Sequence, residues 1–157
     1  MVYDSAGVLR ADDGSELARV EALPAPALAR LVAGADSYEI EKPSALGWYF
    51  QLLDGGRGVV YDFKPGLRKG GTMRAAGGEE VAKLLKALIG TSWTITPAGS
   101  EPIEVKRREG LVGSVVADDG RIVAPDLDLS VPGTTALGDD LARLLAFACW
   151  LIAEWDA

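Results

Sequence analysis

The densest group of side chains that could bind a ligand lies between residues 64 and 74. This segment carries three glycines and four cationic residues: Lys64, Arg68, Lys69 and Arg74. Cationic side chains hold phosphate oxygens, and glycines let backbone amides approach an anion closely. The spacing does not match the Gly-x4-Gly-Lys-Ser/Thr loop that binds nucleotides, so nucleotide hydrolysis is not implied. The segment predicts an anion-binding site, with a solvated basic loop between two strands as the plainer alternative.

A second basic run, Lys106-Arg107-Arg108, could lie beside the first one in the folded chain. Successive residues of a strand face opposite sides, so Arg107 would point away from its two neighbours. Convergence of the two runs into one patch is therefore a hypothesis that the sequence alone leaves open.

Pairs of aspartates offer a second kind of chemistry. Residues 12–14 and 118–120 both read Asp-Asp-Gly, which is typical of hairpin turns because glycine supplies a positive φ. Asp126 and Asp128 lie two residues apart and would project from one strand face. There they could bind a divalent cation or act as a glycosidic acid and base. The solvated side of an amphipathic strand explains them equally well.

Side chains suited to covalent catalysis are scarce. The chain has no histidine, which removes the commonest general base and the commonest metal ligand. Its one cysteine, Cys149, lies within an apolar run, where a thiol is typically a small core residue. No Gly-x-Ser-x-Gly turn occurs in the sequence. We therefore expect a protein that is not an enzyme and that holds no metal and no cofactor.

The overall charge restricts the partners. Lysine and arginine number 16 against 23 acidic residues, and the net charge of −7 argues against a duplex nucleic-acid partner. A single cysteine allows no internal disulfide, and Met1-Val2-Tyr3-Asp4 is unlike a signal peptide, so we expect a cytoplasmic protein. Residues 1–157 have the length of a single domain.

The element that must organise the fold is the last one, residues 139–155. From Leu144 to Ala153 every residue is apolar, and a helix that is apolar all round must be buried. The run is too short to cross a membrane, which takes about 20 apolar residues, so we expect no transmembrane segment. Asp139 and Asp140 suit the positive N-terminal end of this helix.

Before this helix the chain reads as about ten short strands. Residues 59–64 and 127–131 show the period-2 alternation of apolar and polar side chains most clearly. One exception is predicted at residues 79–89, whose apolar residues are spaced as on one face of an amphipathic helix: Val81, Leu84, Leu85 and Leu88. Lysines on the opposite face of this helix place it outside the sheet.

These features predict an α+β fold that is mainly β. Strands with a single apolar face must cover that face, and closing the sheet removes its exposed edges. We expect a closed antiparallel β-barrel of about 12 strands that encloses the hydrophobic C-terminal helix, with the amphipathic helix outside.

Three stretches of the sequence carry a resemblance to a known family: residues 141–155, the aromatic run Trp48-Tyr49-Phe50 and the strand Trp93-Thr94-Ile95. With the short strands before the last helix, they resemble the tubby C-terminal-like superfamily, which includes phospholipid scramblases and plant LURP-one-related proteins. The resemblance implies a twelve-stranded barrel around a central hydrophobic helix and a non-enzymatic role, such as the phosphoinositide binding of tubby proteins. The sequence carries no cysteine-rich acylation segment, so the resemblance does not extend to scramblase activity.

Two functions follow as hypotheses. The first is a non-enzymatic module that binds anionic phospholipid headgroups or a small anionic ligand, through residues 64–74 or the mouth of the barrel. The second is an acidic protein-interaction module, a regulatory or immunity-type partner of a basic protein. Salt-sensitive binding to phosphoinositide vesicles would favour the first, and co-purification with a basic protein would favour the second.

Overall fold

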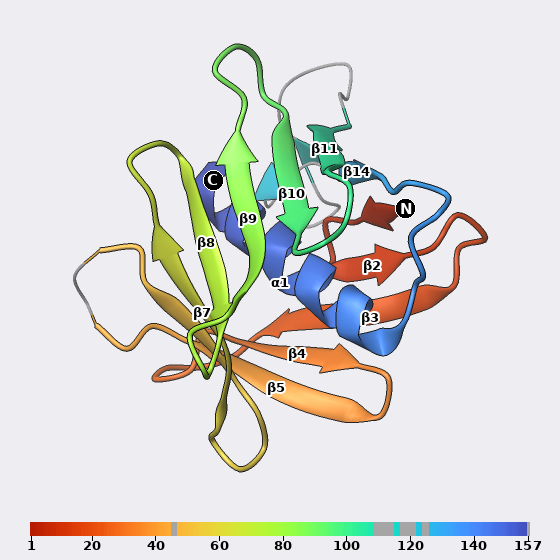
Figure 1. The fold of residues 1–157 in the computed structure, drawn as a ribbon. Helices are drawn as coiled ribbons and strands as arrows, with labels where there is room; N and C mark the ends of the chain where they lie inside the picture. The colour runs from red at the N-terminus through yellow and green to blue at the C-terminus, as the bar shows by residue number, and fades with distance from the viewer. Residues whose placement is uncertain (45–46, 109–114, 117–121, 124–125, 157) are drawn as a thin grey trace.

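The computed structural model describes residues 1–44, 47–108, 115–116, 122–123 and 126–156. A succession of short strands leads to one helix at the end of the chain, as Figure 1 shows. The elements are β1 (Val2–Tyr3), β2 (Val8–Arg10), β3 (Glu16–Ala22), β4 (Ala29–Ala33), β5 (Asp36–Glu41), β6 (Phe50–Leu53), β7 (Val59–Pro65), β8 (Gly70–Ala75), β9 (Glu80–Lys86), β10 (Trp93–Pro97), β11 (Ile103–Arg107), β12 (Val115–Val116), β13 (Ile122–Val123), β14 (Leu127–Ser130) and α1 (Asp139–Asp156).

Twelve of the strands form one closed antiparallel barrel, in the order β1-β14-β11-β10-β9-β8-β7-β6-β5-β4-β3-β2. The strands β12 and β13 pair with each other in a separate two-stranded sheet. Most neighbours in the barrel are consecutive along the chain, and β14 closes the ring by pairing with both β1 and β11. The predicted closed antiparallel barrel and its mainly β composition are confirmed.

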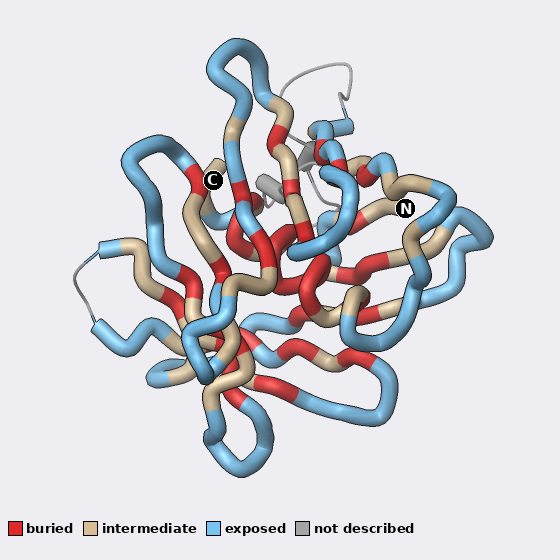
Figure 2. The backbone as a smooth tube through the Cα atoms, in the orientation of Figure 1, coloured by how far each residue is buried: buried red, intermediate tan, exposed pale blue. Residues whose placement is uncertain are grey.

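Alternating side chains explain why these segments pair as strands. In β10, Trp93, Ile95 and Pro97 are buried while the residues between them are only half-buried. Figure 2 shows the buried residues gathered in the middle of the molecule and the exposed ones in the loops. The predicted turn at residues 12–14 is confirmed, with a φ of 86° at Gly14. The second predicted turn, residues 118–120, lies outside the described residues.

The helix α1 carries the apolar run that the sequence predicts for it. Nine of its residues are buried: Ala142, Leu144, Leu145, Ala146, Phe147, Ala148, Cys149, Leu151 and Ile152. Phe147 stacks with Tyr61 of β7 at 6.2 Å between ring centroids, and Trp150 meets Phe50 of β6 edge to face at 5.4 Å. The helix also approaches β2, β3, β4 and β10. Its apolar surface is therefore covered by side chains from many strands.

The amphipathic helix predicted at residues 79–89 is wrong, because this segment contains the strand β9. Its buried residues, Ala82 and Leu84, alternate with the exposed Lys83 and Leu85. β9 bonds to β8 on one side and to β10 on the other, so a helix here would leave both neighbours with unpaired edges. Alanine, leucine, lysine and glutamate favour helices by only a few tenths of a kcal/mol per residue, about the scale that tertiary pairing routinely overrides.

Candidate functional site

Two neighbouring loops at one end of the barrel carry the most exposed large aliphatic side chains of the described chain. We call them the loop pair: residues 66–69, between β7 and β8, and residues 87–92, between β9 and β10. The N–H of Lys86 donates to the carbonyl oxygen of Lys69 at 3.0 Å, and the Arg68 guanidinium donates to the carbonyl oxygen of Lys86 at 3.3 Å. Figure 1 shows both loops at the end of the barrel where the C-terminus lies. These bonds hold the loops side by side.

The loop pair exposes large aliphatic side chains. Leu67 is fully exposed, at 109%, while Leu88 and Ile89 are 83% and 92% exposed. Each of these side chains keeps most of its apolar surface in water, and burial of that surface against a partner or a membrane would be favourable. Exposed apolar side chains on neighbouring loops are candidates for contact with a partner or a membrane. Sequence reasoning missed Leu88 and Ile89 as exposed residues, because it placed Leu88 on the apolar stripe of a helix.

Lys64, Arg68 and Lys69 bring positive charge to the same end of the barrel. All three are exposed, and among the residues that the structure describes none of them forms an ion pair with a carboxylate. Most other described cations are paired, as Arg57 is with Glu41 at 2.8 Å. The three predicted ligand residues therefore keep their charge available to an external anion.

The fourth predicted residue, Arg74, lies elsewhere. β8 runs away from the loop pair, which places Arg74 about 13 Å along the strand from Gly70. Its guanidinium donates to the carbonyl oxygen of Gly78, in the turn between β8 and β9, at 3.1 Å. In the second basic run, Lys106 lies 3.4 Å from the carboxylate of Glu104 on its own strand. Three of the four predicted ligand residues, Lys64, Arg68 and Lys69, therefore lie at the loop pair, and Arg74 does not.

The last residues of α1 contact the base of the loop pair. The Asp156 carboxylate accepts from the Lys86 ammonium at 3.0 Å and from the Trp93 indole N–H at 2.9 Å. Trp155 stacks on Trp48, with ring centroids 4.3 Å apart, and packs against Trp93 at 5.7 Å. The helix end and the base of the second loop are therefore joined by a carboxylate and by aromatic packing.

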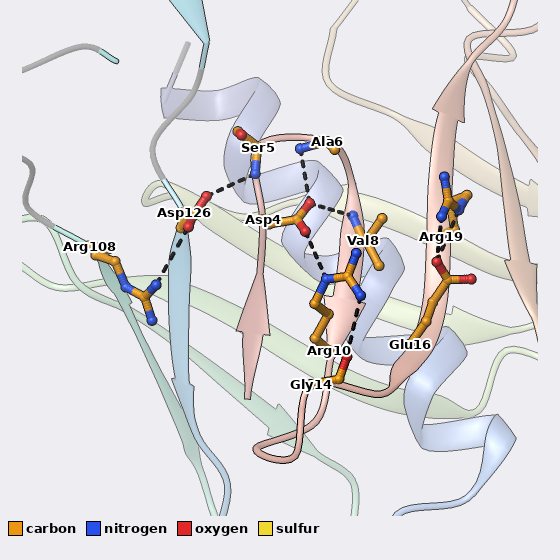
Figure 3. A network of polar contacts seen from close by, with 10 residues as sticks. All are labelled: Asp4, Ser5, Ala6, Val8, Arg10, Gly14, Glu16, Arg19, Arg108 and Asp126. Atoms are coloured by element: carbon orange, nitrogen blue, oxygen red, sulfur yellow. Dashed lines mark hydrogen bonds and ion pairs between the residues drawn. The ribbon is translucent and has the colours of Figure 1, made fainter. Parts of the chain in front are cut away.

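The two aspartates at positions 126 and 128 serve as partners of one arginine. Figure 3 shows Asp126 between the backbone N–H of Ser5, at 2.9 Å, and the guanidinium of Arg108. Arg108 also donates to both carboxylate oxygens of Asp128, at 2.6 and 3.2 Å. The bidentate pair with Arg108 accounts for the Asp128 carboxylate, and the Ser5 N–H and Arg108 together account for that of Asp126. No group of three or more potential metal ligands occurs in the described part of the chain.

Cys149 is buried in α1, and burial raises the pKa of its thiol. Because the thiolate is the reactive form, the native protein should resist modification by a disulfide reagent at pH 8. The same reagent should titrate one thiol per chain after unfolding in guanidinium chloride. Rapid reaction of the native thiol would contradict the burial of this face of α1.

Within the described ranges, no helix combines the length and the apolar character needed to cross a membrane. The three most exposed large aliphatic side chains of the described chain, Leu67, Leu88 and Ile89, lie in the loop pair. Comparisons with models of protein families, with curated proteins and with solved structures find no match to this chain.

Proposed function

We propose that this protein binds anionic phospholipid surfaces through the loop pair. The observation that carries the proposal is the make-up of the loop pair. Leu67, Leu88 and Ile89 have most of their surface in water. Arg68 and Lys69, in the first of these loops, have no carboxylate partner in the described chain. Aliphatic tips would enter the boundary between headgroups and acyl chains, while Arg68 and Lys69 remain among the headgroup phosphates.

Magnitudes support a peripheral, reversible attachment. Full burial of one leucine or isoleucine side chain is worth about 1.5–3 kcal/mol, and each cation near an anionic surface about 1 kcal/mol. Association entropy consumes several kcal/mol of this sum. Neither signal alone would hold the protein, but aliphatic insertion and basic contact together would.

The net charge of −7 does not oppose this mode of binding. Charges more than about 8–10 Å from the contact are screened at physiological ionic strength, so the local cations govern the approach. Many acidic residues elsewhere form ion pairs with neighbouring cations, as Glu16 does with Arg19 at 2.6 Å.

At the level of the fold, we infer a tubby-like arrangement in which the barrel surrounds α1. This inference is supported by the contacts of the helix with strands from β2 to β7 and with β10, and by the complete burial of Leu145 and Phe147. Resemblance to a family with phosphoinositide-binding members is consistent with the proposed lipid contact.

The test is co-sedimentation with vesicles of phosphatidylglycerol. We expect the wild-type chain to bind them, less so at high salt, and the L67S/L88S/I89S variant to lose about tenfold or more in affinity. The Leu137→Ser variant is the matched control, because Leu137 is 51% exposed but precedes α1 at its other end.

A second pair of variants tests the charges. Arg68→Gln with Lys69→Gln should weaken vesicle binding by about tenfold, from the loss of two headgroup contacts. Arg30→Gln with Arg74→Gln removes the same charge away from the loop pair and should leave binding unchanged. Equal binding by all variants would overturn the proposal and leave a protein partner as the better explanation of the exposed loops.

A further inference from the structure

A cavity of about 370 Å³ opens between the last turns of α1, the strands β3 and β6, and the segments that carry Leu28 and Lys42. Small-molecule sites typically span about 300–1,000 Å³. Three aromatic side chains line the cavity, together with one cation and one carboxylate: Trp48, Phe50, Trp150, Lys42 and Glu154. Apolar walls with two opposite charges describe a site for a small ligand that itself carries both charges.

The three aromatic rings form a rigid corner. Phe50 meets Trp48 at 5.2 Å and Trp150 at 5.4 Å between ring centroids, and both pairs are edge to face, at 74° and 83°. Trp48 is held from behind by its stacking on Trp155. Corners of this kind bind ammonium groups, because the ring faces are electronegative. A cation already takes this position, since the Lys42 ammonium lies 5.8 Å from the Phe50 ring centroid.

Glu154 adds a negative charge to the same wall. It follows Trp150 by four residues on α1, so the two side chains share one face of the helix. Neither Glu154 nor Lys42 forms an ion pair within the part of the chain that the structure describes. Burial also raises the pKa of the Glu154 carboxyl, which fits a carboxylate that lacks a cationic neighbour.

We infer that this cavity is a binding site for a zwitterionic phosphate ester of an amino alcohol, of which phosphocholine is the simplest soluble probe. The trimethylammonium group would lie on the faces of Phe50 and Trp150, beside Glu154. The Lys42 ammonium would leave the ring and pair with the phosphate. Charge complementarity selects this ligand: a fatty acid would leave Glu154 without a cation, and a simple cation would leave Lys42 without an anion.

The inference goes beyond attachment to anionic surfaces and does not depend on it. A soluble headgroup should bind in the absence of any membrane. The test is titration of phosphocholine into the full chain, followed by tryptophan fluorescence and by calorimetry. We expect saturable binding, with choline alone and glycerol 3-phosphate alone each binding about tenfold more weakly because each satisfies only one of the two charges.

Two variants separate the roles of the charges. Glu154→Gln should weaken both phosphocholine and choline, whereas Lys42→Gln should weaken phosphocholine and leave choline unchanged or improved. Glu104→Gln with Lys106→Gln removes a pair of opposite charges from another strand and should leave both ligands unaffected. Absence of saturable phosphocholine binding, or equal binding by the Glu154 and Lys42 variants and wild type, would overturn the inference.

The two proposals can fail separately. Glu154→Gln should still bind phosphatidylglycerol vesicles, which carry no ammonium group, because the loop pair is intact. Arg68→Gln with Lys69→Gln should still bind free phosphocholine. Loss of both activities in both sets of variants would indicate unfolding, which circular dichroism of each variant detects.

Discussion

Replacement of Leu145 by alanine should lower the free energy of unfolding by about 2–5 kcal/mol. Leu145 is fully buried on α1, within the core cluster that includes Phe63, Trp93 and Ile95. The substitution removes apolar surface from the core and leaves a cavity that the surrounding strands fill only partly. Urea denaturation followed by circular dichroism measures the effect as a lower midpoint with an unchanged slope.

Leu88→Ala is the matched control for this measurement. The same atoms are removed from a side chain that is 83% exposed, so the free energy of unfolding should change by about 0.5 kcal/mol or less. Leu88→Ala should instead weaken binding to vesicles. Similar destabilisation by the two substitutions would mean that α1 is not the centre of the core.

Gly70→Ala should also destabilise the barrel strongly, by about 3–5 kcal/mol. Gly70 begins β8 with a φ of 129°, a conformation that side chains with a Cβ rarely adopt. An added Cβ would overlap with the carbonyl oxygen of Leu84 on the neighbouring strand β9. Neither backbone can shift without breaking the ladder that joins β8 to β9.

Alanine substitutions at two glycines in the turn between β8 and β9 separate the conformational part of this cost from the steric part. Gly78 has a φ of 87° with open space around it, so Gly78→Ala should cost about 1–2 kcal/mol from conformation alone. Gly77 has neither a positive φ nor a close neighbour, and Gly77→Ala should be nearly neutral. Equal thermal denaturation curves for the Gly70 and Gly77 variants would refute the steric argument.

The ladder that fixes Gly70 between β8 and β9 matters for the proposed function, because it holds the ends of the loop pair in place. Gly70 lies directly after the first loop of the pair, and Lys86, at the base of the second loop, is bonded to Asp156 of α1. Loops anchored at their bases can present aliphatic tips to a bilayer at a smaller entropic cost of ordering than free loops. Their position follows from the same strand ladder that closes the barrel.

Much of the fold could be predicted from the sequence because burial imposes local patterns. A helix that is apolar all round, from Leu144 to Ala153, can exist only in a core, and alternation in segments such as residues 59–64 defines a strand with one buried face. Turn glycines such as Gly14 mark where strands reverse. Each of these signals depends on neighbours along the chain, so each is visible without the structure.

Other features depended on neighbours in space. Residues 80–86 have the composition of a helix, yet pairing with β8 and β10 makes them a strand. Strand direction also divided the predicted basic segment: it kept Lys64, Arg68 and Lys69 near the loop pair and carried Arg74 toward the other end. The corner formed by Trp48, Phe50 and Trp150 required the meeting of β6 with α1, two elements almost a hundred residues apart, because only tertiary packing brings such distant side chains together.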